Sequence, residues 1–453
     1  MTTKFYIILM ILLPFVGFSQ EAPKGFSLQE AIDFALQNNR NSMNAQLDIE
    51  AAKAQKWETT ATGLPQVSAA VDYQNFLKQQ VQVIPAEFFG GNPGEFAEIV
   101  FGTKQSMNAT ATLSQKVFDG SYLVALQSAK VFLEISENAK TKTDLEVRKG
   151  VINAYGNVLL AEESVQILQR NLAVLQKNLE ETTKIFENGL EEEESVEQLQ
   201  ITLAGVESNL NNVTRMKTLA YQMFNITLGL DINRPTILVD DLERLTKENI
   251  SLELLETEAN VENTIDYQIA ENDKVTKELL LKLEKSKALP TLDAFINGGY
   301  SAFSDDFTFT KKEQMWFGSS LFGLNLNIPI FSSGMRSAAT QRAEINLQKA
   351  EIDLIEKEQT IQFEITAAKS DYQFAIEDYD NKKQNLMLAE RIEAKNQTKF
   401  FEGISSSFDL RQAQTQLYSA QQEFLQAMLD VIKAKAELET SLNTVQLNNQ
   451  KKL

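Results

Sequence analysis

The chain contains no cysteine and no histidine. Without cysteine it can form no disulfide, no thiolate metal site and no lipidated N-terminal cysteine. Without histidine it lacks the commonest general base and the commonest metal ligand of proteins. It also has no glycine-rich phosphate loop and no Gly-x-Ser-x-Gly sequence. We therefore expect no enzyme activity, no cofactor and no bound metal.

Positive charge is scarce, with 43 Lys and Arg against 62 Asp and Glu and a net charge of −19. A nucleic-acid partner is not expected, because phosphates are neutralised by Lys and Arg. Long apolar runs are missing as well. The stretch Phe5–Phe18, which follows Lys4, is too short for an ordinary membrane helix and predicts a signal peptide over residues 1–19. The alternative is a non-cleaved anchor; either way, we expect an exported protein.

What the chain does have is a duplication. Val117-Phe118-Asp119-Gly120 opens a long predicted helix, and Ile330-Phe331-Ser332-Ser333-Gly334 opens another about 213 residues later. A Leu-Pro pair precedes each set of elements, at Leu64-Pro65 and Leu289-Pro290. Two structural repeats are therefore predicted, with Gly63 as the C-terminal cap of the helix before the first pair.

Upstream of each long helix, apolar and polar residues alternate strictly. In the first half the apolar residues are Val67, Ala69, Val71 and Tyr73, then Met107, Ala109, Ala111, Leu113 and Val117. In the second half they are Leu292, Ala294, Ile296 and Tyr300, then Phe322, Leu324, Leu326, Ile328 and Ile330. This period predicts half-buried strands of the length that crosses a bilayer when tilted. Four strands cannot close a barrel in lipid, whereas three copies supply twelve; the alternative is a small soluble sheet.

The long helices carry apolar residues at mixed three- and four-residue spacing, such as Leu168, Leu172, Leu175 and Leu179. This spacing is typical of coiled coils. Each long helix is followed by an antiparallel partner, and Gly189 and Gly403 supply the positive φ that the intervening turns need. The sequence therefore predicts two helical hairpins.

These patterns divide the chain into a signal peptide, two repeats, a linking segment and a tail. The first repeat covers 20–230, with strands at about 65–76 and 105–118 and a helical hairpin over 121–228. The linking segment is 231–256. The second repeat covers 257–446, with strands at about 290–301 and 316–330 and a hairpin over 335–446, and 447–453 is a polar tail. Residues 77–104 and 304–315 are predicted to be loops.

The order and spacing of these motifs resemble the TolC-type outer-membrane efflux family over about residues 26–446. The family often has Pro-Leu-Phe-Asp-Gly-Gly where each strand meets its helix. This chain keeps Pro329 in the second half and has no proline in the first. The resemblance implies a mainly α, internally duplicated fold. A long coiled-coil α-helical barrel continues from a trimeric twelve-stranded outer-membrane β-barrel, to which each chain gives four strands.

The resemblance also implies a passive exit duct for a tripartite efflux pump or a type I secretion system. It implies a homotrimer in outer-membrane lipid, with the helical part in the periplasm. The partners would be a periplasmic adaptor (membrane fusion) protein and an inner-membrane transporter of RND or ABC type. The longer first loop would lie outside the cell. An aromatic belt at the membrane interface is predicted at Tyr73, Tyr300, Trp316, Phe317 and Phe322, for which ordinary strand aromatics are the alternative.

Asp409 is the candidate periplasmic constriction. It stands six residues after Gly403, where the family commonly places a constricting Asp, and a second Asp three residues later is replaced by Gln412. Three such carboxylates near one axis would repel each other and favour cations. The alternative is a carboxylate that interacts with its own helix N-terminus after the cap candidates Ser405, Ser406 and Ser407.

The other site candidates lie at the predicted turns. An acidic periplasmic mouth is predicted at Glu191, Glu192, Glu193, Glu194 and Glu197, for which a solvated helix start is the alternative. Adaptor-facing hairpin tips are predicted at Gly189, Leu190, Gly403 and Ile404, for which simple turn chemistry is the alternative. For the whole chain, the alternative to a channel is an exported periplasmic or surface coiled-coil protein with a structural role.

Overall fold

The computed structural model describes residues 25–444, so the predicted signal peptide and polar tail lie outside the described residues. Contacts divide the chain into two units. One unit comprises the chain up to Met43, Asp144–Glu258 and the chain from Thr366; the other comprises Asn44–Thr143 and Ala259–Ile365. Helices α2 (Arg40–Ala61), α3 (Gly120–Glu187) and α8 (Met335–Phe401) run through both units.

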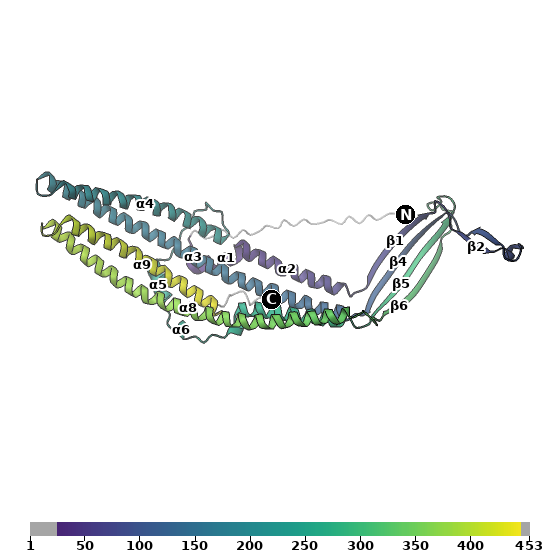
Figure 1. Cartoon of the computed structure of the whole chain (residues 1–453). Helices are drawn as coiled ribbons and strands as arrows, with labels where there is room; N and C mark the ends of the chain where they lie inside the picture. The colour runs from purple at the N-terminus through teal and green to yellow at the C-terminus, as the bar shows by residue number, and fades with distance from the viewer. Residues whose placement is uncertain (1–24, 445–453) are drawn as a thin grey trace, which may run out of the picture. The chain divides into compact units, whose positions relative to one another are not determined.

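The second unit contains a four-stranded antiparallel sheet (Figure 1). Its strands are β1 (Gln66–Asn75), β4 (Gln105–Phe118), β5 (Thr291–Ser304) and β6 (Phe317–Asn327), in the order β1-β4-β5-β6. Two strands therefore come from each half of the chain, and the central pair joins the two halves. Within the described chain, β1 and β6 each have a strand neighbour on one side only.

The register of this sheet separates an apolar face from a polar one. Val67 lies opposite Leu113, Leu113 opposite Ile296, and Ile296 opposite Phe322. The adjacent row on the other face starts with Ser68, Thr112 and Asn297, and Asn297 Nδ2 donates a hydrogen bond of 2.7 Å to Thr112 Oγ1. Side chains directly opposite each other share a face. The alternation seen in the sequence therefore forms continuous apolar and polar rows across both halves.

The aromatic residues predicted to form one belt do not share a face. Tyr300 lies in the row of Val71 and Ala109, on the apolar face. Phe317 lies opposite Ser301, on the other face, with its ring centroid 6.3 Å from that of Phe303. The single-belt prediction is therefore wrong for Phe317, because the register of β6 against β5 decides its face.

Residues 77–104 were predicted to be a loop, and this prediction is wrong. The segment contains β2 (Val81–Pro85), the 3-10 turn η1 (Ala86–Phe89) and β3 (Phe96–Val100). The two strands pair antiparallel, with Val81 opposite Val100. Each strand has only five residues, and the glycine-rich turn between them dominates the local sequence signal. We call residues 76–104 the outer hairpin.

Gly63 was predicted to cap a helix with a left-handed backbone, and it does not. Gly63 is not among the glycines with positive φ. A Cβ atom at Gly63 would lie 2.1 Å from the ring of Tyr122, whose hydroxyl donates a hydrogen bond of 3.0 Å to the Thr60 carbonyl oxygen. Glycine is needed here because an aromatic ring from the start of α3 lies directly against the backbone.

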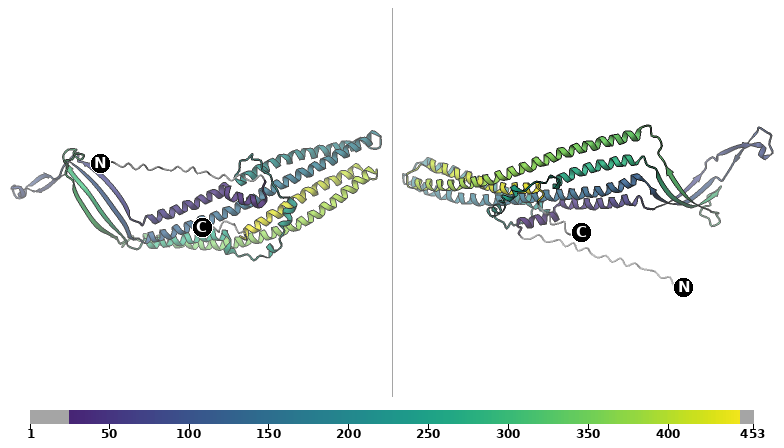
Figure 2. Two further views of the ribbon diagram at one scale, coloured as in Figure 1. Left: turned by 180° about the vertical axis from the view of Figure 1, so that it is seen from behind. Right: turned by 90° about the horizontal axis from the view of Figure 1, so that it is seen from below.

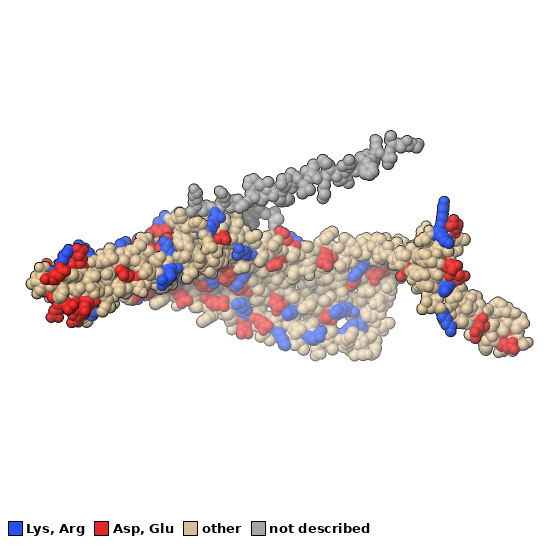
Figure 3. All heavy atoms as spheres, turned by 90° about the horizontal axis from the view of Figure 1, so that it is seen from above, with Lys and Arg blue, Asp and Glu red and all other residues tan. Residues whose placement is uncertain are grey.

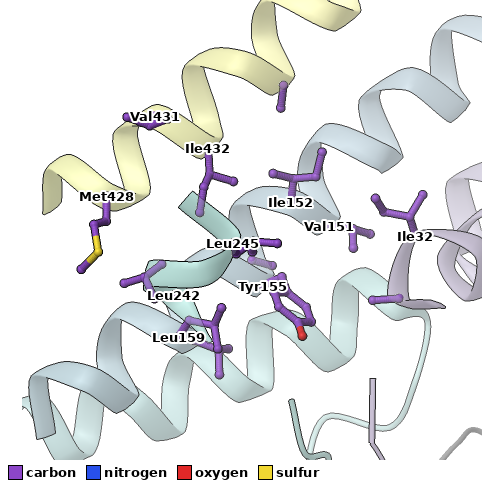
Figure 4. Packing of buried hydrophobic residues seen from close by; sticks show 14 of the residues in the cluster. Ile32, Val151, Ile152, Tyr155, Leu159, Leu242, Leu245, Met428, Val431 and Ile432 are labelled. Carbon is purple, nitrogen blue, oxygen red and sulfur yellow. The ribbon is translucent and has the colours of Figure 1, made fainter. Parts of the chain in front are cut away.

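The first unit holds the helical hairpins and the main core (Figure 4). Figures 1 and 2 show that α3 pairs with α4 (Glu193–Leu228), and α8 with α9 (Ser407–Ser441). Two helices of the linking segment, α5 (Leu242–Glu248) and α6 (Glu253–Glu256), and α1 (Leu28–Asn38) contribute further side chains to this core. In the second unit, α7 (Ile265–Ser286) precedes β5, and η2 (Val261–Asn263) precedes α7.

Tyr155 is the polar anchor of this core. Its side chain is fully buried, and its hydroxyl lies 2.8 Å from both the Phe26 carbonyl oxygen and Asp240 Oδ2. The Leu28 amide donates a 2.7 Å hydrogen bond to the same Asp240 oxygen. Burial raises the pKa of Tyr155, so the phenol stays protonated. The start of the described chain is thereby fastened to both α3 and the linking segment.

Among residues 25–444, no helix combines the length and the apolar character needed to cross a bilayer.

Tyr155→Phe should destabilise the helical unit by about 1–3 kcal/mol, because it leaves buried polar partners without a hydroxyl. The check is the thermal midpoint of the helical circular dichroism signal in detergent. Tyr221→Phe is the matched control, since the Tyr221 hydroxyl donates a hydrogen bond of 3.0 Å to Glu162 Oε1 and the residue is only half-buried. Equal losses in the two variants would contradict the anchoring role of Tyr155.

Candidate functional site

The two hairpins end in turns of the same construction. Gly189 and Gly403 have φ values of 74° and 73°. The Leu190 amide donates to the Ile185 carbonyl at 3.1 Å, and the Ile404 amide donates to the Lys399 carbonyl at 2.8 Å. These bonds are those of a Schellman turn, which requires a left-handed residue and so favours glycine. The positive φ predicted for both glycines is confirmed.

An apolar residue projects from each turn. The residue after the glycine is Leu190 in one turn and Ile404 in the other, and they are 78% and 72% exposed. In many Schellman turns this residue packs back on the helix. Here both side chains instead present apolar surface to solvent, side by side with the exposed acidic residues described below.

The helix starts after the two turns are capped differently. At the second turn, Ser406 and Asp409 form a capping box. Asp409 Oδ2 accepts hydrogen bonds from the Ser406 hydroxyl at 2.7 Å, the Ser406 amide at 3.2 Å and the Ser405 hydroxyl at 3.1 Å. The hydrogen bonds from Ser406 lower the pKa of Asp409. The capping interaction that the sequence offered as an alternative for Asp409 is therefore present, on a side chain that is also exposed.

At the first turn, an acidic residue occupies the N-cap position and a serine occupies the third helical position, the reverse of the second turn. Glu192 occupies the N-cap position and makes no side-chain cap hydrogen bond, while Ser195 occupies the position that corresponds to Asp409. The Ser195 hydroxyl donates to Glu191 Oε1 at 2.6 Å. The start of α4 is thus stabilised by the carboxylates of its first turn acting on the helix dipole.

The predicted acidic residues gather on this turn. Glu192, Glu193, Glu194 and Glu197 are exposed, and Glu191 is half-buried. Figure 3 shows acidic side chains concentrated at this end of the helices. Each turn therefore combines an exposed apolar residue with exposed carboxylates, and we call the two turns, residues 188–197 and 402–409, the hairpin tips.

Within the first hairpin, α3 and α4 hold together by apolar contacts. Leu168 and Leu175 of α3 pack with Leu199 and Val206 of α4, and all four are buried. This is the coiled-coil contact predicted from the leucine spacing.

Between the two hairpins, Tyr418 of α9 packs on this cluster, and the other contacts described here are polar. Asn171 Nδ2 donates to Gln421 Oε1 at 2.8 Å, and Gln397 Nε2 donates to Asn178 Oδ1 at 3.2 Å. The hydroxyls of Ser195 and Ser407 lie 2.9 Å apart. We call these six hydrogen-bonded residues the interhairpin seam. Replacing such hydrogen bonds by hydrogen bonds to water changes the free energy little. The seam therefore contributes less to stability than the apolar contacts inside a hairpin.

Two buried polar atoms in this part of the described chain lack hydrogen-bond partners, one in the seam residue Asn178 and one in Thr182, which lies one turn farther along α3. Asn178 and Thr182 are 1% and 0% exposed, and the Nδ2 atom of Asn178 and the hydroxyl of Thr182 have no hydrogen-bond partner in the described chain. Nearby on α8, desolvation raises the pKa of Glu393. A buried polar group without a partner costs free energy, so separation of the hairpins in water would relieve part of this cost.

The seam residues and Glu393 were not predicted from the sequence. The available signal was the heptad: Asn171 and Asn178 are one heptad apart within the leucine-rich part of α3. A polar residue recurring beside an apolar seam marks a face with a different partner. The sequence could not identify that partner, because Gln397 and Gln421 lie more than 200 positions away.

No group of three acidic side chains in the described part of the chain is arranged to hold a metal ion.

Comparison with known proteins accounts for this arrangement. A model of the family "Outer membrane efflux protein" matches residues 31–224 and 280–444. The outer membrane protein TolC of Vibrio cholerae is 23% identical over 344 residues, which cover 75% of this chain and 77% of TolC. The match accounts for the duplication and for both hairpins, which the alternative of a structural coiled-coil protein does not.

Solved channel structures have the same fold. CusC superposes with a TM-score of 0.72 at 19% identity, covering 92% of this chain and 91% of CusC. The CmeC outer membrane channel of Campylobacter jejuni gives 0.71 at 18% identity, covering 92% and 85%. VceC of Vibrio cholerae gives 0.71 at 17% identity, covering 92% and 95%. The predicted fold class, an internally duplicated and mainly α-helical chain that contributes four strands to an outer-membrane barrel, is confirmed.

The family match spans both repeats, both hairpins and all four strands of the large sheet. The chain belongs to the outer membrane efflux protein family and is an outer-membrane exit duct of efflux pumps.

Proposed function

We propose that three copies of this chain close one twelve-stranded barrel and form a single duct. The observation that carries the proposal is the sheet order, in which β1 and β6 are the outer strands. An unpaired edge in hydrocarbon costs several kcal/mol per backbone group. Pairing β6 of one copy with β1 of the next removes every such edge when the ring closes.

We further propose that the hairpin tips receive a periplasmic adaptor (membrane fusion) protein, which links the duct to an inner-membrane transporter of RND or ABC type. The support is the exposure of Leu190 and Ile404 on turns fixed by Gly189 and Gly403. Paired apolar knobs on rigid turns suit insertion into a complementary surface. The transporter supplies the energy, and the duct itself needs no catalytic group.

The charges of the tips determine what passes the periplasmic mouth. Glu191, Glu192, Glu193, Glu194 and Glu197 give the first tip an excess of negative charge. Asp409 adds one carboxylate per copy at the second tip, and its lowered pKa keeps that carboxylate ionised at neutral pH. Three copies would place these groups around one axis, which favours cations over anions.

The interhairpin seam is proposed to be the place where the mouth opens. Each hairpin keeps its own apolar contacts, while the hydrogen bonds between hairpins exchange for hydrogen bonds to water. The second hairpin can then move relative to the first without either hairpin unfolding.

The double variant Leu190→Asp, Ile404→Asp should abolish pump-dependent resistance, because charge on both knobs prevents insertion into an adaptor. The purified variant should still be a three-chain particle by native mass spectrometry and should still conduct ions in planar bilayers, with a cation preference at least as strong as that of the parent because of its added carboxylates. Leu190→Met with Ile404→Val is the control that keeps apolar knobs. Retained resistance in the charged variant would exclude the tips as the adaptor surface, and a one-chain parent particle would exclude the three-copy duct.

Asp409→Asn should weaken cation preference, measured as a shift in reversal potential, because it removes one charge per copy while the Asn side-chain oxygen can still accept from Ser406 in the capping box. Ser406→Ala is the matched control. It removes the cap hydroxyl, at a cost of about 0.5–2 kcal/mol to α9, and keeps the carboxylate. If Ser406→Ala alone reproduced the change in selectivity, Asp409 would act only as a cap.

Glu393→Gln should stabilise the second hairpin, in which Glu393 of α8 lies beside Gln414 and Tyr418 of α9, and should remove a pH dependence. Since the folded-state pKa of Glu393 is raised, the folded protein binds this proton more tightly than the unfolded chain. Its stability therefore increases as pH falls from neutral through that raised pKa, and Gln mimics the protonated form at all pH values. We expect the thermal midpoint of the variant, measured between about pH 5 and 7.5, to be higher than that of the parent at neutral pH. It should also change less with pH. An unchanged slope would show that Glu393 does not titrate in this range.

A further inference from the structure

The outer hairpin has no counterpart in the second half of the chain. β2 and β3 form a two-stranded sheet of their own between β1 and β4, whereas the connection from β5 to β6 contains no strand. The Phe76 amide donates to the Lys104 carbonyl at 2.9 Å, just beyond the last β1–β4 pair, Asn75 with Gln105. The outer hairpin therefore emerges from the end of the β1–β4 pair, at its base.

The position of the outer hairpin follows from the chain order. α2 precedes β1 and α3 follows β4, so the helices join one end of this strand pair and the outer hairpin leaves from the other. In an outer-membrane duct with its helices in the periplasm, this other end opens to the cell exterior.

The outer hairpin is rich in uncovered apolar side chains. No residue from 76 to 104 is buried. The exposed large apolar residues are Phe76, Leu77, Val81, Val83, Phe88, Phe89, Phe96, Val100 and Phe101. A lone two-stranded hairpin is only marginally stable in water, and a cluster of this kind commonly marks an interaction surface.

One face of the hairpin concentrates these residues. Val81 lies opposite Val100, and Pro85 lies opposite Phe96. Val83, between them, lies opposite Glu98, which is the only charged residue on this face. Val83 and Phe96 are 60% and 70% exposed. The face thus offers an apolar strip with one carboxylate that can remain at its aqueous rim.

Charge along the hairpin does not favour a lipid surface as the occupant. Lys78 and Lys104 lie near the base, whereas Glu87 and Glu95 flank the turn at the free end. Figure 3 shows acidic atoms toward this free end. Anionic headgroups would attract the base and repel the acidic end, so a lipid surface is not favoured as the occupant of the hairpin's apolar face.

We propose that the outer hairpins of three copies pack against one another through the face of Val81, Val83, Phe96 and Val100, and cap the outer mouth of the duct. This inference rests on the proposed three-copy barrel. Ring closure through β6 and β1 places one β1, with its attached hairpin, in each third of the rim. The occupant of each apolar face is then the same hairpin of a neighbouring copy, in continuity with the barrel interface.

Such a cap would make the outer mouth a second point of control. The cap closes by burying apolar side chains, and three Glu98 carboxylates near one axis limit how tightly it closes. Passage of cargo from the periplasmic side would separate the hairpins.

The absence of cysteine makes this proposal directly testable, because any introduced thiol is the only one in the chain. Val83→Cys places a thiol on the proposed contact face, and Gln82→Cys, one residue earlier, places it on the opposite face. After mild oxidation of native outer membranes, Val83→Cys should give disulfide-linked dimers containing up to about two thirds of the chains of closed trimers. Gln82→Cys should give few or none.

Conduction provides the second readout. Oxidised Val83→Cys should lose most of its conductance in planar bilayers and should regain it after reduction, while Gln82→Cys should conduct equally before and after. A disulfide requires Cα atoms within about 7 Å, so a short bismaleimide should be used alongside oxidation to cover a looser contact.

Any other outcome contradicts the proposed packing of the outer hairpins. If neither reagent links Val83→Cys, or if both thiols link equally well, the hairpins do not pack through this face. If Val83→Cys is instead protected from maleimide in membranes but not in detergent, lipid or another protein covers the face. Native mass spectrometry of the same samples separates these results from failure of the barrel proposal, because a three-chain particle without cross-links excludes only the cap.

Discussion

Backbone amides and carbonyls at the edge of a sheet cannot be left without partners in hydrocarbon, and this constraint governs the whole protein. The chain makes four membrane-length strands and pairs them in the order β1-β4-β5-β6. The central pair unites the two halves, and the outer strands remain available. The apolar row that begins at Val67 and ends at Phe322 needs lipid against it. In the proposed three-copy barrel, neighbouring copies pair with these edges. The exclusion of unpaired polar groups from hydrocarbon would then account for both membrane insertion and assembly.

In the helical part, the contacts within the first hairpin differ in kind from many of those between the two hairpins. Buried leucines join α3 to α4 within a hairpin, whereas amides and hydroxyls join one hairpin to the other near the tips. Exposing a buried apolar side chain to water costs free energy that water does not return. A hydrogen bond between two amides can instead be replaced by hydrogen bonds from each amide to water. Buried polar atoms without partners at Asn178 and Thr182 lower the cost of separation further. Farther from the tips, the buried core joins the hairpins through residues such as Ile152 of α3 and Ile432 of α9. The proposed movement between hairpins is therefore confined to the end near the tips.

The two structural repeats share some features and differ in others. Both turns keep the left-handed glycine and the exposed apolar residue after it, because the backbone geometry leaves little choice. The helix starts differ: the second turn has the Ser406–Asp409 capping box, and the first has acidic residues without a side-chain cap at Glu192. At the opposite end of the strands, only the first half carries the outer hairpin. The two repeats thus differ at the hairpin tips and at the ends of the strands that are not joined to helices.

The sequence by itself determined the features that depend on local periodicity. Alternation over about ten residues specified the four long strands, leucine spacing specified the hairpins, and Gly189 and Gly403 specified their turns. These signals suffice because each residue's position on a strand or helix follows from its neighbours in the chain. The sequence pattern did not reveal β2 and β3, because five-residue strands around a glycine-rich turn carry too little alternation to be distinguished from a loop.

The tertiary structure alone decided which distant residues meet. Gly63 is required by the ring of Tyr122 and not by a helix cap. Phe317 faces away from Tyr300 because of the register between β5 and β6. Asn178 meets Gln397 across more than 200 residues of chain. In each of these, the relevant neighbour is remote in sequence, and its identity depends on packing and register that no local pattern records.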